Sequence, residues 1–179
     1  VYVQRPLYEA FVAAAKAEAE KQVVGPGLEA GVTLGPLVNA AGRDKVESFV
    51  QDALAKGAAV VTGGARPPAL ERGYFYQPTL LTNVTAAMRV SCDEVFGPVL
   101  PISPFDTLEQ GVQLANDTPY GLAGYILTND LKTAALAYEG LRFGVIGVND
   151  LVPSTPEAPF GGMKQLSLIH ISEPTRLLS

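Results

Sequence analysis

The sequence has little of the side-chain chemistry from which most self-contained catalytic sites are built. Its 179 residues include one cysteine, Cys92, and one histidine, His170. One cysteine excludes an internal disulfide framework and a cysteine-rich zinc site, so a reducing compartment, the cytoplasm, is the expected location. His170 lies in the last 14 residues, which are not expected to belong to the folded protein, and without it the chain has no imidazole for a Ser-His-Asp triad or a histidine-ligated metal.

A basic surface and a long apolar run are missing as well. The formal net charge is -5, which gives no electrostatic footprint for nucleic acid or an anionic membrane. No apolar stretch approaches the roughly 20 residues of a membrane span. The chain begins at Val1 without a charged-then-apolar leader, which suggests a piece of something longer. We therefore expect no binding to nucleic acid or to a membrane.

What the sequence does contain is an alternation of helical and strand-like patterns. Residues 1–4 read as a short strand, and Pro6 suits the first turn of a helix that reaches about Gln22. The Gly- and Pro-rich stretch that follows predicts a loop. A second helix is predicted from Asn39, with Gly57 at its C-terminal cap. Its apolar positions recur with helical spacing at Val46, Phe49, Val50, Ala53 and Leu54.

Strand patterns and helix starts continue to alternate in the rest of the chain. Residues 58–64 predict a buried strand and a turn, and Pro78 predicts that the run around it is an edge or irregular strand. Asp106 is expected to cap one helix, and Asn129-Asp130 is expected to cap another that starts at Leu131. Strand-like runs at 97–105, 121–130 and 143–149 complete the series. This order predicts an α/β fold with a largely parallel sheet flanked by helices.

Several loops and strands also carry a resemblance to a known family. The strings GPLVNAAGRDKVESFV, GAAVVTGG, GYFYQPTLL, DEVFGPVLPI, ANDTPYGLAGYILTND and APFGGMKQ follow one another in register between residues 35 and 165. One such string is a weak signal, whereas the ordered set is specific. The chain resembles the NAD(P)-dependent aldehyde dehydrogenases over residues 1–165, and it is similar to the catalytic-domain part of their fold.

The resemblance implies an enzyme that oxidises an aldehyde to a carboxylic acid with NAD or NADP. In that family the catalytic cysteine lies a few residues before the strand matched here by VYVQ, and the general-base glutamate lies further upstream. Both are therefore expected before Val1, so no catalytic residue is assigned here and the 179-residue chain is expected to be inactive. The family also implies a homodimer or homotetramer as the parent assembly.

Cys92, the single thiol of the chain, lies between a serine and two carboxylates in SCDEVFGPV, and the question is whether it could act as a nucleophile. The neighbouring Asp93 and Glu94 disfavour a thiolate, and the family resemblance matches Cys92 to a variable position. Arg89 lies close in sequence and leaves open the alternative that the thiol is reactive. We interpret Cys92 as a bystander.

Glu94 and Phe96 are the candidate coenzyme-binding residues. In the family the matching glutamate accepts hydrogen bonds from the nicotinamide ribose hydroxyls, and the matching phenylalanine packs against that end of the coenzyme. A carboxylate suits a vicinal diol because its two oxygens can accept both hydroxyl protons. The alternative interpretation is a solvated loop carboxylate beside a core aromatic residue.

The segment NDLVPSTPEAPFGG is the candidate substrate loop, because it borders the aldehyde tunnel in the family. Ser154, Thr155 and Phe160 are its candidate contact residues. Small hydroxyl groups could donate hydrogen bonds to a carboxylate of the substrate, and a loop of this kind resembles that of the succinate-semialdehyde branch of the family. The alternative is that Ser and Thr beside Pro are ordinary turn residues. Asn149, at the end of the preceding strand, is interpreted as a strand-end cap.

The last segment, residues 166–179, departs from the family pattern. The string LSLIHISEPTRLLS resembles a translated sequencing adapter, and we expect it to be an artefact rather than a folded tail. One rival hypothesis from another class remains open for the whole chain. It is a truncated, non-enzymatic dehydrogenase module that binds a subunit or a nucleotide.

Overall fold

The computed structural model describes residues 1–153 and 160–166 of the chain. The chain divides into two compact units, residues 1–104 and 105–179. No helix in the described ranges has the length and apolar character needed to cross a membrane.

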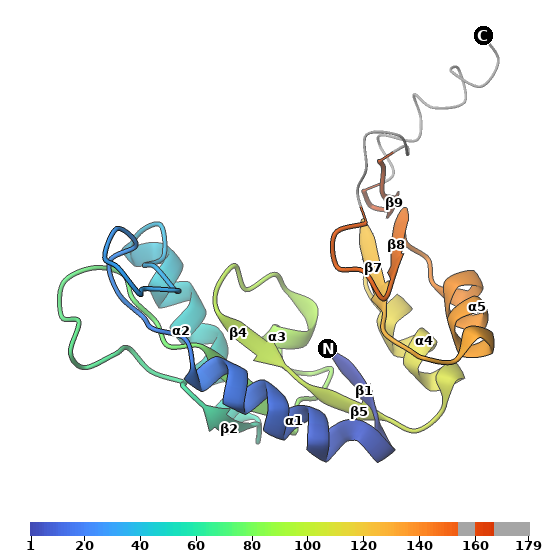
Figure 1. Cartoon of the computed structure of the whole chain (residues 1–179), viewed down its shortest axis with the longest axis horizontal. Helices are drawn as coiled ribbons and strands as arrows, with labels where there is room; N and C mark the ends of the chain where they lie inside the picture. Colours follow the sequence, from blue (N-terminus) through green and yellow to red (C-terminus); the bar gives the residue numbers. More distant parts are fainter. Residues whose placement is uncertain (154–159, 167–179) are drawn as a thin grey trace, which may run out of the picture. The chain divides into compact units, whose positions relative to one another are not determined.

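The first unit consists of three helices and the strands around them (Figure 1). Its elements are β1 (Tyr2–Gln4), α1 (Arg5–Glu20), α2 (Ala40–Ala55), β2 (Ala59–Thr62), β3 (Thr79–Thr82), α3 (Arg89–Cys92), β4 (Val99–Pro101) and β5 (Ser103–Phe105), the last of which runs into the second unit. Pro6 lies in the first turn of α1, as predicted. Strands β2, β3 and β4 form one sheet in that order, and β1 pairs with β5.

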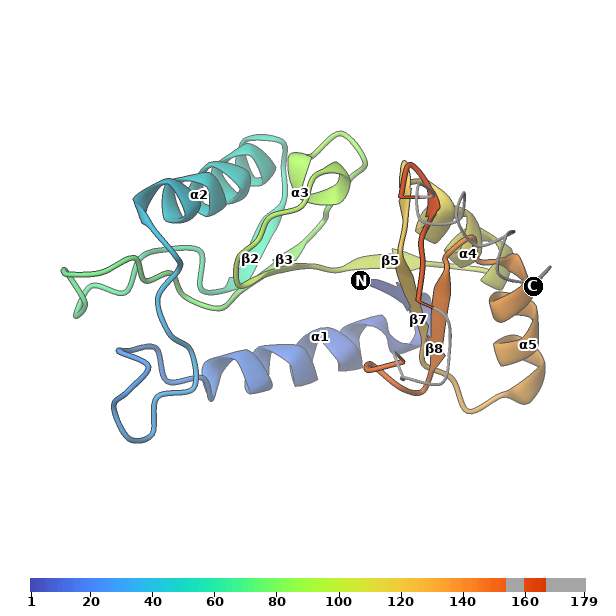
Figure 2. The same cartoon turned by 90° about the horizontal axis from the view of Figure 1, so that it is seen from above.

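The sheet of the first unit is covered by a helix on each face. Figure 2 shows α1 on one side of β2 and β3 and α2 on the other. Consecutive residues of β3 point to opposite faces of the sheet. Leu81 packs with Phe49 and Val50 of α2, whereas Leu80 packs with Phe11 of α1. The strand is therefore buried on both faces and forms the centre of this unit.

Two local predictions for this unit are wrong, and one residue of a confirmed helix is more exposed than its neighbours in the apolar stripe. Pro78 precedes β3 rather than interrupting it, so β3 is the central strand, antiparallel to β2 and parallel to β4. The predicted buried strand, β2, lies at the edge of the sheet, with Val60 36% exposed. Leu54 belongs to the apolar stripe of α2 but is 37% exposed, whereas Val46 and its other predicted partners are buried.

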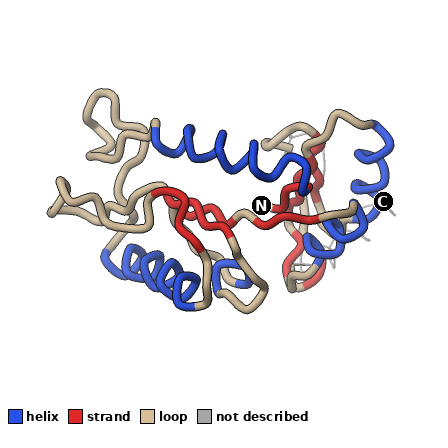
Figure 3. The backbone as a smooth tube through the Cα atoms, turned by 90° about the horizontal axis from the view of Figure 1, so that it is seen from below, coloured by secondary structure: helices blue, strands red, loops and turns tan. Residues whose placement is uncertain are grey.

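The described residues of the second unit, 105–153 and 160–166, form two helices and two small sheets. Its elements are α4 (Leu108–Asn116), β6 (Tyr120–Gly121), β7 (Ala123–Ile126), α5 (Leu131–Gly140), β8 (Val145–Val148) and β9 (Met163–Lys164). Strands β7 and β8 pair in parallel, and α5 connects them and contacts both (Figure 3). This is the βαβ arrangement expected of a parallel pair. Strands β6 and β9 pair antiparallel.

The helix caps of this unit differ in one place from the prediction. Asp130 caps α5 as predicted, since its side chain accepts a hydrogen bond from the backbone N–H of Thr133. The cap of α4 is Thr107, whose hydroxyl accepts from Gln110, and Asp106 lies one residue outside. Asp and Thr are both favoured N-caps, so a pattern that contains both leaves the boundary uncertain by one residue.

Candidate functional site

The clamp loop, residues 93–98, carries Glu94 and Phe96 between α3 and β4. Its C-terminal end is fixed to the central strand, because the N–H of Thr79 donates to the carbonyl of Pro98 at 2.8 Å. The N–H of Val99 also donates to the carbonyl of Gly97 at 2.8 Å. The loop therefore starts from a short helix and ends in a strand of the sheet, which fixes both of its ends.

Gly97 allows the clamp loop to lie against the core. A Cβ atom added at Gly97 would lie 2.3 Å from Cγ2 of Val46, a residue with no exposed surface. Val95, two residues earlier, also packs against this core. The two positions that bracket Phe96 are thus held inward, which leaves the phenylalanine between them to project outward.

Phe96 combines an unusual backbone with an exposed ring. Its φ angle is +52°, in the left-handed region that costs a residue with a Cβ about 1–2 kcal/mol. Its side chain is 75% exposed, so the core gains little from it. Backbone strain of this kind occurs often at ligand-binding positions, where the surrounding structure enforces it. Phe96 is therefore not part of the core of the first unit, and its ring offers an apolar surface there.

Lys45 of α2 supports the clamp loop from outside. Its Nζ donates a hydrogen bond to the backbone carbonyl of Glu94 at 2.7 Å. The same ammonium lies 5.4 Å from the ring centroid of Phe96 and 5.5 Å from that of Phe49, within cation–π range. One cation thus connects both candidate coenzyme residues to α2.

The segment that leads into the clamp loop is tied to the same helix. The guanidinium of Arg89 lies 4.1 Å from the ring centroid of Phe49 and pairs with Asp93 at 3.7 Å. The N–H of Arg89 donates to Asp52, whose carboxylate also pairs with Lys56 at 2.8 Å. The hydrogen bond from Lys56, followed by that from the Arg89 N–H, lowers the pKa of Asp52 from its ordinary value of 3.8.

Cys92 takes no part in this arrangement. Its thiol is exposed, and its Sγ donates to the carbonyl of Ala86 at 3.1 Å. The contacts described for the Arg89 side chain are to Phe49, Ser48 and Asp93. The structure thus gives no support to the alternative that Arg89 activates the thiol. The single histidine, His170, lies outside the described residues.

The chemistry of the clamp loop suits a ligand with a sugar next to a flat apolar group. Glu94 is exposed, and its backbone is fixed through its carbonyl. Its carboxylate can accept two hydrogen bonds from adjacent hydroxyl groups. Phe96, two residues on, offers a ring for stacking. Within residues 1–153 and 160–166 no three His, Cys, Asp or Glu side chains are grouped to hold a metal ion.

The candidate substrate residues belong to the second unit. Phe160 is 53% exposed, whereas Ser154 and Thr155 lie outside the described residues. Asn149 follows β8, and its carboxamide makes two hydrogen bonds with the backbone of Thr128. A hollow of about 320 Å³ lies beside this pair, lined by Thr128, Asn129, Asp130, Leu131, Ala134, Val148 and Asn149.

Lys45 is the residue of the site that sequence reasoning missed. It lies 49 positions before the carbonyl that it binds. Its place on α2 was nevertheless a signal, because it precedes Val46 and lies four residues before Phe49 of the buried stripe. A cation at the margin of a buried helix face is suited to bind the loop that packs there.

Residues 1–172 match the model of the aldehyde dehydrogenase family. The chain is 44% identical over 168 residues to a mitochondrial succinate-semialdehyde dehydrogenase of Arabidopsis thaliana, covering 94% of this chain and 31% of that protein. The chain thus spans about a third of the length of such relatives.

Two solved structures have the same fold as this chain. A succinate-semialdehyde dehydrogenase from Burkholderia pseudomallei superposes with a TM-score of 0.87 at 44% identity, over 92% of this chain and 34% of that one. A betaine aldehyde dehydrogenase from Staphylococcus aureus in complex with NAD+ gives 0.86 at 37% identity, over 92% and 33%. These matches confirm the predicted α/β fold class. The chain belongs to the aldehyde dehydrogenase family.

Proposed function

We propose that this chain supplies the nicotinamide-ribose contact and part of the substrate wall of an enzyme that oxidises a semialdehyde with NAD+ or NADP+. The reaction converts an aldehyde, water and NAD(P)+ to a carboxylic acid, NAD(P)H and a proton. Succinate semialdehyde or a similar short semialdehyde is the proposed substrate. The support for this class is the 44% identity to a succinate-semialdehyde dehydrogenase.

The clamp loop is the single observation that carries the proposal. An exposed phenylalanine in a left-handed backbone has no evident use in the core of this unit. Beside the coenzyme it has one, because Phe96 would contact the nicotinamide end while Glu94 accepts hydrogen bonds from the ribose hydroxyls. When bound, NAD(P)+ accepts a hydride from the reacting carbon. The task of these two residues is to bind and orient that end of the coenzyme.

We further propose that the 179 residues do not catalyse the oxidation by themselves. Cys92 is exposed, lies beside Asp93 and Glu94, and donates to a carbonyl rather than to a base. A thiol nucleophile needs a cationic or basic neighbour to form the thiolate. The nucleophile and general base of the active enzyme would thus come from residues other than these.

Complementation tests this proposal. The purified chain is incubated with succinate semialdehyde and NAD+ or NADP+, alone and after co-refolding with the N-terminal two-thirds of a matching succinate-semialdehyde dehydrogenase. Formation of NAD(P)H is followed by its absorbance. We expect no turnover from either part alone and turnover from the mixture. The two coenzymes, compared in the same assay, identify the one that is used.

Two results would contradict the proposal. Turnover by the chain alone would show that it contains its own nucleophile. Binding to the other part without turnover would favour a non-enzymatic subunit-binding module instead.

The parent enzyme is proposed to be a homodimer or homotetramer, and a chain with one cysteine suits the cytoplasm.

A further inference from the structure

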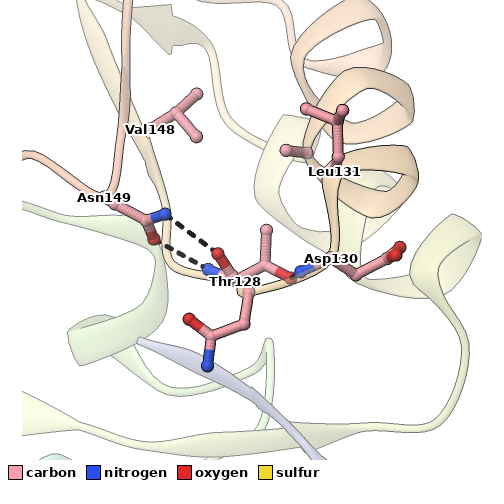
Figure 4. A pocket seen from close by; sticks show the side chains of 7 residues that line it. Thr128, Asp130, Leu131, Val148 and Asn149 are labelled. Atoms are coloured by element: carbon pink, nitrogen blue, oxygen red, sulfur yellow. Dashed lines mark hydrogen bonds between the residues drawn. The ribbon is translucent and has the colours of Figure 1, made fainter.

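Asn149 makes more contacts than a strand-end cap requires. Its backbone N–H donates to the carbonyl of Ile126 at 2.8 Å, which is the last bond of the β7–β8 pairing. Its side-chain Oδ1 accepts from the N–H of Thr128 at 3.0 Å, and its Nδ2 donates to the carbonyl of Thr128 at 2.9 Å. Figure 4 shows the carboxamide facing the Thr128 backbone with both bonds drawn.

This pair of bonds imitates one step of a β ladder. A carboxamide has one acceptor and one donor group, as a peptide unit does. One side chain therefore satisfies both backbone groups of Thr128 after the two strands have ended. The main chain of Asn149 is thereby free to turn away from β7 without leaving those groups unpaired.

The backbone around Asn149 takes a tight bend. The φ angle of Asn149 is +55°, a left-handed value that Asn tolerates better than most residues. At Gly147 an added Cβ would lie 2.2 Å from the carbonyl oxygen of Asp150, so only glycine permits this bend. The carboxylate of Asp150 then accepts the N–H of Val152 at 2.9 Å. The direction in which the chain leaves β8 is thus fixed by specific contacts.

Thr128 connects this bend to α5. Its hydroxyl accepts the N–H of Asp130 at 3.2 Å, and Asp130 in turn caps the helix through Thr133. The carboxamide of Asn149 is consequently held by a segment that a helix cap makes rigid.

Strand β9, which follows the candidate substrate segment in sequence, is held by a long-range bond of its own. Lys164 has a φ angle of +58°, and its ammonium donates to the carbonyl of Asn116 at the end of α4, at 2.9 Å. It also lies 5.1 Å from the ring centroid of Phe143. A cation is favourable at a helix C-terminus because the last carbonyls carry partial negative charge.

We propose that Asn149 is a positioning residue for the substrate wall: its carboxamide replaces a peptide group at the end of the β7–β8 ladder and sets the path of residues 150–153. That residues 150–153 border the substrate rests on the proposed function. The positioning itself depends only on contacts within this unit, so it can be tested without aldehyde or coenzyme.

The test is amide hydrogen exchange of the 15N-labelled 179-residue chain, read by NMR at Thr128. Asn149→Gly keeps the left-handed backbone and removes the carboxamide. We expect the Thr128 protection factor to fall about tenfold, with shifted resonances for residues 150–152, which carry amide protons. Asn83→Gly is the matched control, because Asn83 has the same φ of +55° in the other unit. It should leave Thr128 unchanged.

Asn149→Asp provides a reversible second test. The ionised carboxylate keeps the acceptor but loses the donor, whereas the protonated acid has both groups, as the carboxamide does. Protection at Thr128, corrected for intrinsic exchange and compared with wild type, should be low near neutral pH. It should recover as the pH falls below about 4.

Two results would overturn the proposal. One is wild-type protection of Thr128 in Asn149→Gly, and the other is protection in Asn149→Asp that does not change with pH. If Asn149→Gly loses protection throughout α5, the aspartate comparison decides. Failure here would leave the coenzyme proposal intact, because complementation tests that proposal independently.

Discussion

Replacing Lys45 by methionine should loosen the clamp loop while the unit that carries it stays folded. The substitution keeps a side chain of similar length and removes the ammonium. Three interactions are lost: the 2.7 Å hydrogen bond to the carbonyl of Glu94 and the contacts with the rings of Phe96 and Phe49. Val46, Val50 and Ala53 of the buried stripe make none of these contacts, and Phe49 keeps its place in the core cluster with Leu81, so the core remains intact.

The size of the effect follows from these three contacts. A hydrogen bond contributes about 1 kcal/mol net, and a cation–π contact at an exposed site about 0.5–1 kcal/mol. Lys45 is solvent-exposed, which reduces the electrostatic part, and we expect a loss of about 1–2 kcal/mol. If exchange occurs by local opening, amides of residues 93–97 should exchange roughly 5 to 30 times faster.

Hydrogen exchange of the purified chain, resolved by NMR or by mass spectrometry of peptides, measures this change. Lys16→Met is the control, since Lys16 forms an ion pair on the exposed side of α1 with Glu20, 3.7 Å away. It should alter stability by less than about 0.5 kcal/mol and leave the clamp loop unchanged. Unchanged exchange at residues 93–97 in Lys45→Met would refute the role assigned to this lysine.

Three further predictions concern the same unit. Because the native pKa of Asp52 lies below 3.8, its contribution to stability is present above that pH and is lost as the pH falls through the native value; urea denaturation of Asp52→Asn should show a weaker acid dependence than wild type. Gly97→Ala places a methyl group 2.3 Å from Val46 Cγ2 and should lower the free energy of unfolding by about 1–3 kcal/mol, again by urea denaturation; an unchanged midpoint would contradict the packing argument. Phe96→Gly relieves the left-handed strain but makes the unfolded chain more flexible, so the free energy of unfolding should change by less than about 1 kcal/mol. The coenzyme KM of the reassembled enzyme should rise with this variant, and an unchanged KM would count against a coenzyme contact.

Much of the fold could be read from local patterns, because local forces determine it. The buried stripe of α2 was predictable from its helical spacing, and Asp130 from its capping chemistry. The pairing of strands depends on distant partners and was less visible. The run at residues 97–105 reads as one strand, yet it forms β4 beside β3 and β5 beside β1. Nothing within that run indicates the change of partner.

In the candidate site, too, local sequence predicted some features, whereas others depend on contacts between distant residues. Glu94 and Phe96 were predicted from their string and its resemblance, and their assignment to coenzyme stays a prediction. The exposure of Phe96 and its left-handed backbone were not foreseen, because they follow from Gly97 packing on a valine of a distant helix. Lys45 was missed for the same reason: its partner is close only after folding.

The most direct test of the central claim is the coenzyme KM of the reassembled enzyme with Glu94→Gln in this chain. The substitution keeps the size of the side chain but halves its acceptor oxygens and removes the charge. Loss of hydrogen bonds to a charged group predicts a KM about 10 to 100 times higher, while the matched control Glu71→Gln, an exposed carboxylate elsewhere in the same unit, stays at the wild-type value. Equal KM values for the two variants would contradict the assignment of the clamp loop to the coenzyme.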